Sequence, residues 1–188
     1  MKVALVDYGM GNLHSVAKAL EFACAQVVTI SAPEQARGVD SICIPGQGIL
    51  NRCMKSLRER GFDEMLDDWI AQGRPYLGIC LGMQVLFESS EEAGGTEGLG
   101  LIKGHVTRLP DRVTVPHIGW NTVDGEHYYF DHSFAVHPED ESIVDGWCEH
   151  GDRFAASIRT DPITAVQFHP EKSGVAGLEL LRKWVEQL

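Results

Sequence analysis

The chain has 188 residues, of which 44% are hydrophobic and 23% carry a charged side chain. A chain of this length buries about 70% of the surface that its unfolded form exposes, which excludes disorder and a dependence on disulfides or a structural metal. With 16 Lys and Arg against 27 Asp and Glu, the net charge is −11, which excludes nucleic-acid binding because that function needs clustered basic side chains. We expect a single domain over residues 1–188.

The first half of the chain alternates short apolar runs with longer stretches of helical period. Residues 2–8 predict a strand, and Asn12 is placed to cap the helix that follows. Further strands are predicted over residues 26–31, 41–44 and 75–79, and further helices over residues 49–60, 62–71 and 81–91. Buried strands that alternate with helices are typical of a parallel α/β sheet.

The second half is richer in short alternating runs that are separated by turn residues such as Asp124-Gly125. Strands are predicted over residues 101–109, 117–123, 128–136, 153–158 and 163–168, and a last helix over residues 175–187. We expect these strands to be antiparallel. The predicted fold class is therefore α/β, with a mainly parallel central sheet flanked by helices and with antiparallel strands in the second half.

The five cysteines are odd in number and form no C-x-x-C pair. Neither a disulfide framework nor a zinc site is therefore predicted, and a reducing cytoplasm fits best. No run approaches the about 18 apolar residues of a membrane span. The first strand is too short, and too soon interrupted by Asp7, for a signal peptide. We expect a cytoplasmic protein that binds neither a membrane nor nucleic acid.

The segment Gly-Ile-Cys-Leu-Gly at residues 78–82 places Cys80 between a predicted strand and a predicted helix. Small residues on both sides permit the cramped turn of a nucleophile elbow. The positive end of the helix dipole and the free N–H groups there favour a thiolate. By itself the pattern leaves open a nucleophile or one more buried cysteine at a strand end.

The segment Gln-Phe-His-Pro-Glu-Lys-Ser at residues 167–173 places His169 two positions before Glu171. Pro170 stiffens this stretch, so the imidazole and the carboxylate can face the same way. A cysteine, a histidine that takes its proton and an acid that orients the histidine are the parts of a thiol triad. On its own, the His-x-Glu pattern also fits a structural histidine in a turn.

Together with Pro-Gly-Gln-Gly at residues 45–48, these two segments resemble the class I glutamine amidotransferases. The motifs Val-Asp-Tyr-Gly-Met-Gly-Asn-Leu at residues 6–13 and Val-Pro-His-Ile-Gly-Trp-Asn at residues 115–121 resemble the glutaminase subunits of imidazole glycerol phosphate synthase, essentially from end to end. The resemblance implies that glutamine is hydrolysed to glutamate and ammonia. It also implies a heterodimer with a cyclase (β/α)8-barrel subunit, which receives the ammonia and makes imidazole glycerol phosphate and AICAR in histidine biosynthesis.

The resemblance also implies roles for individual residues. Cys80 would be the nucleophile, His169 the acid and base, and Glu171 the residue that orients the ring. The backbone at Leu81, Gln47 and Gly48 would form the oxyanion hole, Gln84, Glu92 and Gly46 would bind the substrate, and Met10, Gly11, Asn12, Trp120 and Lys172 would face the partner. No metal or organic cofactor is implied. Gln47, Asp131 and Phe134 depart from the family, which more usually has valine, valine and tyrosine there.

Two alternatives remain open. The same glutaminase chemistry could serve another synthase, for example one that makes surface sugars, or the chain could be an idle subunit that only stabilises a synthase. The presence of all three triad residue types weighs against the idle subunit. Because a sheet and a triad occupy a chain of this size, we expect the site that consumes the ammonia on another polypeptide.

Overall fold

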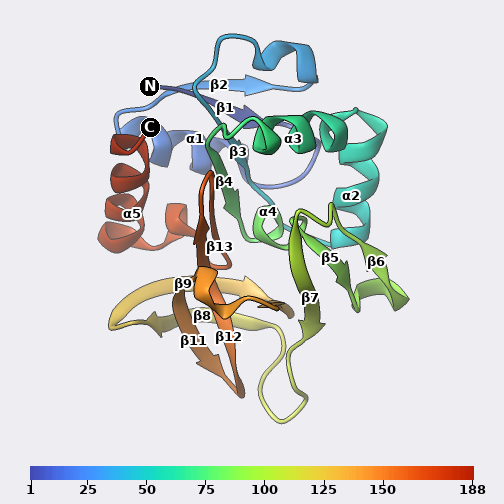
Figure 1. Ribbon diagram of the computed structural model, residues 1–188. Helices are drawn as coiled ribbons and strands as arrows, with labels where there is room; N and C mark the ends of the chain where they lie inside the picture. The colour runs from blue at the N-terminus through green and yellow to red at the C-terminus, as the bar shows by residue number, and fades with distance from the viewer.

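Five parallel strands form one half of a sheet that runs through the whole molecule (Figure 1). The structure is a computed structural model that describes residues 1–188. In spatial order the strands are β2 (Gln26–Ile30), β1 (Lys2–Val6), β3 (Ser41–Ile44), β4 (Tyr76–Ile79) and β13 (Ile163–Val166). β13 comes from near the end of the chain, yet it pairs with β4, so that Val166 lies opposite Ile79. The carboxyl ends of these two strands therefore lie side by side.

The sheet continues from β13 into strands of the second half. These are β12 (Asp152–Thr160), β10 (Phe134–Pro138), β7 (Ile102–Arg108), β5 (Phe87–Ser90) and β6 (Thr96–Glu97), and β11 (Val144–His150) also pairs with β12. β8 (His117–Val123) and β9 (Glu126–His132) form a separate two-stranded sheet. Their turn is Asp124-Gly125, where both residues have positive φ, as a two-residue hairpin of type I′ requires.

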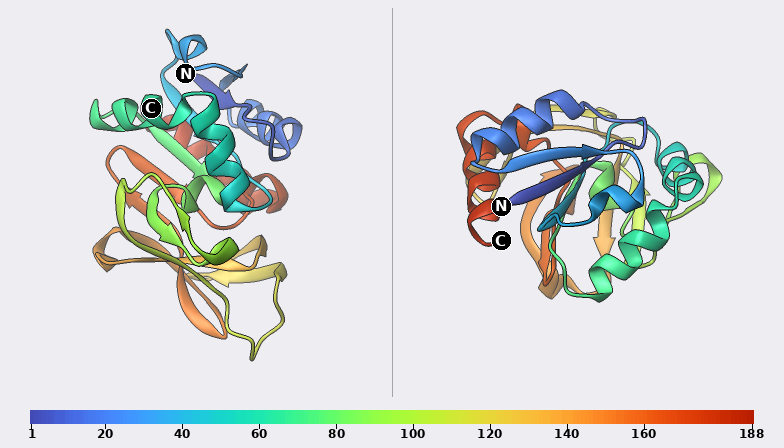
Figure 2. Two further views of the ribbon diagram at one scale, coloured as in Figure 1. Left: turned by 90° about the vertical axis from the view of Figure 1, so that its right-hand side faces the viewer. Right: turned by 90° about the horizontal axis from the view of Figure 1, so that it is seen from above.

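Helices cover both faces of the parallel strands (Figure 2). α1 (Leu13–Phe22) and α5 (Gly174–Glu186) cover one face, and α2 (Leu50–Glu59), α3 (Phe62–Ala71) and the short α4 (Leu81–Gln84) cover the other. Short 3-10 turns are η1 (Pro33–Ala36), η2 (Glu92–Gly94), η3 (Glu141–Ile143) and η4 (Pro170–Lys172). β1 shows why two layers form. Its Val3 and Leu5 pack towards α1 and α5, whereas Ala4 and Val6 pack towards α2 and α3, because successive side chains of a strand point to opposite faces.

The predicted α/β class is confirmed, and so is the cap of the first helix. The Asn12 side chain accepts a hydrogen bond from the Ser15 backbone N–H at 3.2 Å, which satisfies one of the donors that a helix start leaves unpaired. No helix is both long and apolar enough to cross a membrane.

The prediction of a helix over residues 81–91 is wrong beyond its first turn. The helix ends at Gln84, and the chain then forms β5, which pairs in parallel with β7. A short apolar run fits a buried helix and a buried strand equally well. Here the carbonyls of Val85 and Leu86, in the turn before β5, accept hydrogen bonds from the N–H groups of Leu99 and Ile102, so partners that are distant in sequence end the helix.

The second half differs from its prediction in three respects. Residues 128–136 do not form one strand, because the chain changes sheet at Ser133 between β9 and β10. β11 and β6 were not predicted. β13 is antiparallel to β12, as expected, but it is parallel to β4 on its other side. This last difference joins the two halves of the chain in one sheet.

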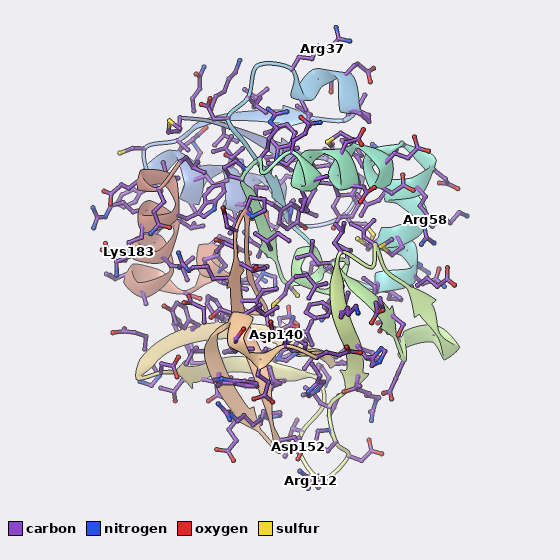
Figure 3. The ribbon with its side chains drawn as sticks, viewed as in Figure 1. Arg37, Arg58, Arg112, Asp140, Asp152 and Lys183 are labelled. Carbon is purple, nitrogen blue, oxygen red and sulfur yellow. The ribbon has the colours of Figure 1, made fainter.

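Charged side chains are spread over the surface. In Figure 3 the labelled Arg37, Arg58, Arg112 and Lys183 lie at widely separated places around the molecule. Arg112 forms an ion pair with Asp152 at the end that is farthest from Arg37. These four basic side chains are therefore dispersed and do not form the single patch that a phosphate backbone would need.

Candidate active site

The turn at Cys80 has the geometry of a nucleophile elbow. Cys80 joins β4 to α4 with φ 54° and ψ −104°, and the residue is only 4% exposed. Such a backbone conformation costs about 1–3 kcal/mol in a residue other than glycine and is found at functional sites. A Cβ on Gly82 would lie 2.0 Å from the Ile44 carbonyl oxygen, and one on Gly78 would lie 2.3 Å from the Gly82 oxygen. The two glycines are therefore required by space.

His169 and Glu171 follow the neighbouring strand, β13. Nδ1 of His169 lies 2.8 Å from Oε1 of Glu171, and the two side chains are 3% and 2% exposed. The backbone N–H of His169 donates to the Tyr129 carbonyl at 2.8 Å, and its carbonyl accepts from the Ser173 hydroxyl at 2.6 Å. Since Nε2 has no hydrogen-bond partner, it is the ring atom that is free for proton transfer.

The surroundings of His169 favour its charged form. Burial lowers the pKa of the imidazole, but the interactions with the Cys80 thiol and with the Glu171 carboxylate outweigh burial and raise the pKa above its ordinary value. The charged form is therefore favoured in an imidazole whose Nδ1 meets the Glu171 carboxylate at 2.8 Å. This is the arrangement in which a histidine can deliver a proton to a leaving group.

The other buried cysteines are held as thiols. Burial raises the pKa of Cys53 and of Cys148 to about 12, and it raises the pKa of Cys43 still further. None of these three residues lines the pocket that Cys80 adjoins. Cys24 is exposed at the end of α1. Only Cys80 combines a place at the pocket with the histidine and the acid.

A pocket of about 320 Å³ adjoins Cys80. Its lining consists of Gln47, Gly48, Cys80, Leu81, Gln84, Glu92, Pro116, Asp131, His132, Ser133 and Phe134. Leu81 is the first residue of α4, where an N–H has no acceptor within the helix. The backbone N–H groups of Gln47 and Gly48 also donate no hydrogen bond within the protein. The pocket is therefore bordered by backbone donors that a developing negative charge could use.

Gly46 belongs to the loop over residues 45–48, but it faces Leu81 and Tyr8 and does not line the pocket. A Cβ at this position would be 2.4 Å from Cβ of Leu81 and 2.9 Å from the Tyr8 hydroxyl oxygen. The Tyr8 hydroxyl donates to the carbonyl of Pro45 at 2.6 Å. Gly46 thus allows residues 45–48 to approach the start of α4, instead of contacting the pocket itself.

Gln84 and Glu92 both line the pocket, as predicted for substrate-binding residues. Nε2 of Gln84 donates to the Phe134 carbonyl at 3.0 Å and to Oε1 of Gln167 at 2.9 Å. The Glu92 carboxylate accepts from the Leu50 N–H at 2.5 Å, and burial raises the pKa of this carboxyl group. The structure fixes both side chains through these contacts.

Comparison with known proteins identifies the family. A family model described as glutamine amidotransferase class-I matches residues 4–188. Imidazole glycerol phosphate synthase subunit HisH from Herpetosiphon aurantiacus is 44% identical, and the match covers 98% of this chain and 93% of the relative. The subunit of the same name from Acinetobacter baylyi is 43% identical, with 98% of each chain covered. The chain belongs to the HisH family of class I glutamine amidotransferases.

Solved structures agree with the family at the level of the fold. A crystal structure described as a glutamine amidotransferase has a TM-score of 0.77 at 19% identity and covers 97% of each chain. PurLQS from Thermotoga maritima has a TM-score of 0.75 at 14% identity and covers 99% of this chain and 97% of its own. At these identities the likeness shows the class I amidotransferase fold alone.

Of the residues predicted to face a partner, Met10 and Gly11 contact the pocket loop, residues 45–48. The Met10 side chain reaches Gly48, since a Cβ there would be 2.7 Å from Cε of Met10, and Gly11 adjoins residues 45–46. Asn12 is exposed as well as capping α1. Trp120 is 57% exposed and packs its edge against Tyr129, and Nζ of Lys172 lies 3.8 Å from Oδ2 of Asp131.

Two contacts at the site were not predicted. Nε2 of Gln167 lies 3.5 Å from Sγ of Cys80, and Nε2 of Gln47 donates to Oδ2 of Asp131 at 2.8 Å. Gln167 stands within the motif that holds His169, and Gln47 and Asp131 are two of the departures from the family. The motif and the departures mark these residues, but no local pattern indicates that they meet.

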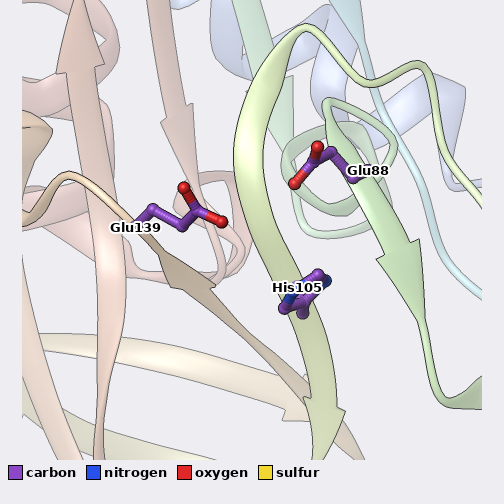
Figure 4. Close-up of side chains that lie close together, drawn as sticks. All are labelled: Glu88, His105 and Glu139. Carbon is purple, nitrogen blue, oxygen red and sulfur yellow. The ribbon is translucent and has the colours of Figure 1, made fainter.

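A group of possible metal ligands lies outside the amidotransferase pocket. The side chains of Glu88, His105 and Glu139 offer ligand atoms within 4.8 Å of one another (Figure 4). All three residues are exposed, Glu88 accepts a hydrogen bond from the Gly104 N–H, and His105 pairs with the Ser89 hydroxyl. We assign no metal site here, because three exposed side chains, two of which already have partners, are not a built coordination site.

Proposed function

We propose that this chain is the glutaminase subunit of an imidazole glycerol phosphate synthase, which hydrolyses L-glutamine to L-glutamate and ammonia for histidine biosynthesis. The observation that carries the proposal is the placement of Cys80, His169 and Glu171 after the adjacent strands β4 and β13, beside a pocket lined by backbone donors. Ligands of open α/β sheets bind at the carboxyl ends of the strands.

In the first half-reaction the Sγ anion of Cys80 attacks the side-chain amide carbon of glutamine. A C–S bond forms, and the carbonyl electron pair moves onto oxygen, where the N–H groups of Leu81 and of the loop with Gln47 and Gly48 stabilise it. The C–N bond then breaks as Nε2 of His169 gives its proton to the nitrogen. Ammonia leaves, and the acyl group remains on sulfur as a thioester.

In the second half-reaction water attacks the thioester carbon. Nε2 of His169 takes a proton from the water, a C–O bond forms, and the C–S bond breaks as its electron pair returns to sulfur. Glutamate leaves, and the charged ring and the anionic sulfur are restored. Glu171 holds the Nδ1 proton of the ring throughout, so Nε2 of the imidazole serves both steps.

The oxyanion donors have the largest effect in this scheme. Removal of one such donor costs about 100- to 1,000-fold in rate. A shift of the thiol towards the anion gains much less, because nucleophilicity falls as the thiolate becomes more stable. The position of the backbone at Gln47 and Gly48 therefore controls the rate more than the ionisation of Cys80 does.

Two polar residues of the pocket recognise the substrate in this proposal. The carboxylate of Glu92 attracts the α-ammonium group of glutamine, and Gln84 contacts the substrate through Oε1, the one polar atom of its side chain that makes no hydrogen bond within the protein. A volume of about 320 Å³ suits a single amino acid.

The ammonia passes to a cyclase (β/α)8-barrel subunit, with which the chain forms a heterodimer. We place Met10, Gly11, Asn12, Trp120 and Lys172 in the interface. Exposed apolar surface on β8 supports this placement, since Ile118 and Trp120 are 59% and 57% exposed. In the proposal, residues 1–188 are one glutamine amidotransferase domain of a cytoplasmic enzyme, which agrees with its five free cysteines.

The decisive experiment measures ammonia release from glutamine in the presence of the cyclase and its nucleotide substrate. Cys80→Ala abolishes the release, while the same complex supplied with free ammonium still makes product, because the triad serves only to produce ammonia. Cys24→Ala, which changes an exposed cysteine outside the pocket, retains the activity. Glutamine hydrolysis by the Cys80→Ala complex would refute the catalytic role of the triad. Full activity with an unrelated synthase would refute the cyclase as the subunit that receives the ammonia.

A further inference from the structure

Two buried amides connect the glutaminase pocket to the sulfur of Cys80. Gln167 is 0% exposed and Gln84 is 3% exposed. Nε2 of Gln84 donates to Oε1 of Gln167 at 2.9 Å, and Nε2 of Gln167 lies 3.5 Å from Sγ of Cys80. An N–H to sulfur contact of this length is a hydrogen bond to a large, diffuse acceptor.

The orientation of both amides follows from the Phe134 carbonyl. That oxygen only accepts, so the NH2 group of Gln84 must face it, and the contact measures 3.0 Å. The second hydrogen of the same NH2 group points at Oε1 of Gln167. The NH2 group of Gln167 is then left facing the sulfur. To turn either amide over would bring two oxygens, or two NH2 groups, into contact.

The backbone holds this chain of amides rigidly. The N–H of Cys80 donates to the Val166 carbonyl, and the N–H of Gln167 donates to the Ala156 carbonyl, both at 2.8 Å. Cys80 and Gln167 therefore leave neighbouring strands at a fixed separation. Gln167 does not line the pocket, so its side chain is available to the sulfur and not to the substrate.

We propose that Gln167 is a further catalytic residue of the glutaminase, one that donates a hydrogen bond from Nε2 to Sγ of Cys80, and that Gln84 is the positioning residue that aims it. The inference rests on the proposed function. The bond is strongest when the sulfur is an anion, because a charged acceptor roughly doubles the strength of a hydrogen bond. The cleavage of the C–S bond meets this condition, because the electron pair then returns to sulfur.

The kinetic consequence separates binding from chemistry. Gln167→Leu keeps the approximate size of the side chain and removes the donor. We expect kcat to fall by about three- to tenfold, because the donor is lost at the sulfur that leaves when the C–S bond breaks, whereas the anion of the variant is somewhat more nucleophilic in the attack. KM for glutamine changes less than about twofold, because Gln167 does not line the pocket and Gln84, which does, is still held by the Phe134 carbonyl.

The test of the inference is the alkylation of Cys80 by iodoacetamide as a function of pH. The sulfur anion displaces iodide, so the rate reports the anion directly and requires no glutamine hydrolysis. The full chain carries Cys24→Gly to remove the exposed cysteine, and the modified residue is identified from the mass of its peptide. In Gln167→Leu the pH of half-maximal rate rises by about one unit. It rises further in Gln167→Glu, where a carboxylate faces the sulfur.

A second variant and a control keep the test decisive. Gln84→Leu leaves the donor in place but removes the group that aims it, so a smaller rise in the same direction is expected even if the Gln167 variants do not fold. Ser41→Ala removes a fully buried hydroxyl on β3 that has no hydrogen-bond partner, and it leaves the profile unchanged.

The outcomes distinguish the inference from the function on which it rests. The role of Gln167 would be overturned if folded Gln167→Leu and Gln84→Leu gave the same alkylation rates at every pH as the chain with Cys24→Gly alone. This holds even if Cys80→Ala abolishes glutamine hydrolysis. Hydrolysis that survives Cys80→Ala would overturn the proposed function, whatever the alkylation profiles show.

Discussion

Positive φ angles at two cysteines have opposite meanings. At Cys80, φ is 54° and the strained turn between β4 and α4 places this residue beside the pocket. At Cys24, φ is 68° and the residue closes α1. There the N–H of Cys24 donates to the Glu21 carbonyl and the N–H of Ala25 donates to the Leu20 carbonyl, which is the Schellman arrangement that usually has glycine. In the proposed function the strain at Cys80 serves the reaction, whereas the strain at Cys24 has no such role and only lowers stability.

Cys24→Gly is therefore expected to stabilise the protein. Relief of the left-handed strain outweighs the added flexibility of the unfolded chain, by about 0.5–1 kcal/mol. For a chain of this length the expected rise in Tm is about 1–4 °C. Thermal unfolding followed by circular dichroism measures it. Cys24→Ala keeps the Cβ and gives no rise, and equal Tm values for the two variants would contradict the explanation.

At the scale of elements, the loop between β3 and α2 is attached to β9 by side chains. Gln47 donates to the Asp131 carboxylate at 2.8 Å, and Lys172 of η4 lies 3.8 Å from the same oxygen. Both residues of the hydrogen bond line the pocket. The loop whose backbone borders the pocket is thus held from across the pocket as well as by the strand before it.

A double-mutant cycle measures this attachment. Gln47→Ala and Asp131→Ala each lower the free energy of unfolding, and the double variant loses about 1 kcal/mol less than the sum, because a half-buried hydrogen bond to a carboxylate has about that strength. Urea unfolding of the four proteins gives the coupling.

The matched cycle pairs Asp131→Ala with Lys172→Ala. Its coupling is smaller, since that ion pair is longer and its side chains are each 29% exposed. Strict additivity of Gln47→Ala and Asp131→Ala would show that the hydrogen bond does not hold the loop.

At the scale of the molecule, a group of histidines joins β8, β9 and β11. Nδ1 of His117 lies 2.9 Å from Nε2 of His132, and the ring of His150 stacks on that of His117 with 3.9 Å between centroids. Burial lowers the pKa of His117 to about 4 and that of His132 to about 3. Folding therefore requires both rings to be neutral.

This requirement makes stability depend on pH. An unfolded histidine has a pKa of about 6.5, so below that pH the unfolded chain binds protons that the folded protein rejects. The free energy of unfolding should fall from about pH 6.5 to about pH 4, by up to about 1.4 kcal/mol per pH unit for each such ring. The pKa of His169 is shifted in the opposite direction, upwards, so its stabilising contribution to the free energy of unfolding is already complete below about pH 6.5. It therefore does not offset this loss.

Urea unfolding between pH 7 and pH 4.5 measures the slope. His132→Gln is expected to flatten it, because glutamine does not titrate. His127→Gln, at an exposed position of β9, keeps the slope of the unaltered protein. An unchanged slope in His132→Gln would show that the buried histidine group does not cause the loss of stability in acid.

Local features of the structure could be predicted from the sequence alone. The strands of the first half are short continuous apolar runs, the Asn12 cap lies beside the helix that it starts, and Gly78 and Gly82 on either side of Cys80 indicate the elbow. In each case the interacting groups are a few residues apart, so spacing and residue type contain the necessary information.

The assembled site required the tertiary structure. The pairing of β4 with β13 brings Cys80 to His169 across 89 positions of the chain. The same pairing places Gln167 at the sulfur, and the approach of β9 gives Gln47 its partner Asp131. The end of α4 at Gln84 likewise depends on the hydrogen bonds that β5 makes with β7. Sequence indicated Cys80, His169 and Glu171 as the candidate triad, because residue type and spacing are local. Only the tertiary structure decided which of them touch, because strand order and register are set by packing between distant segments.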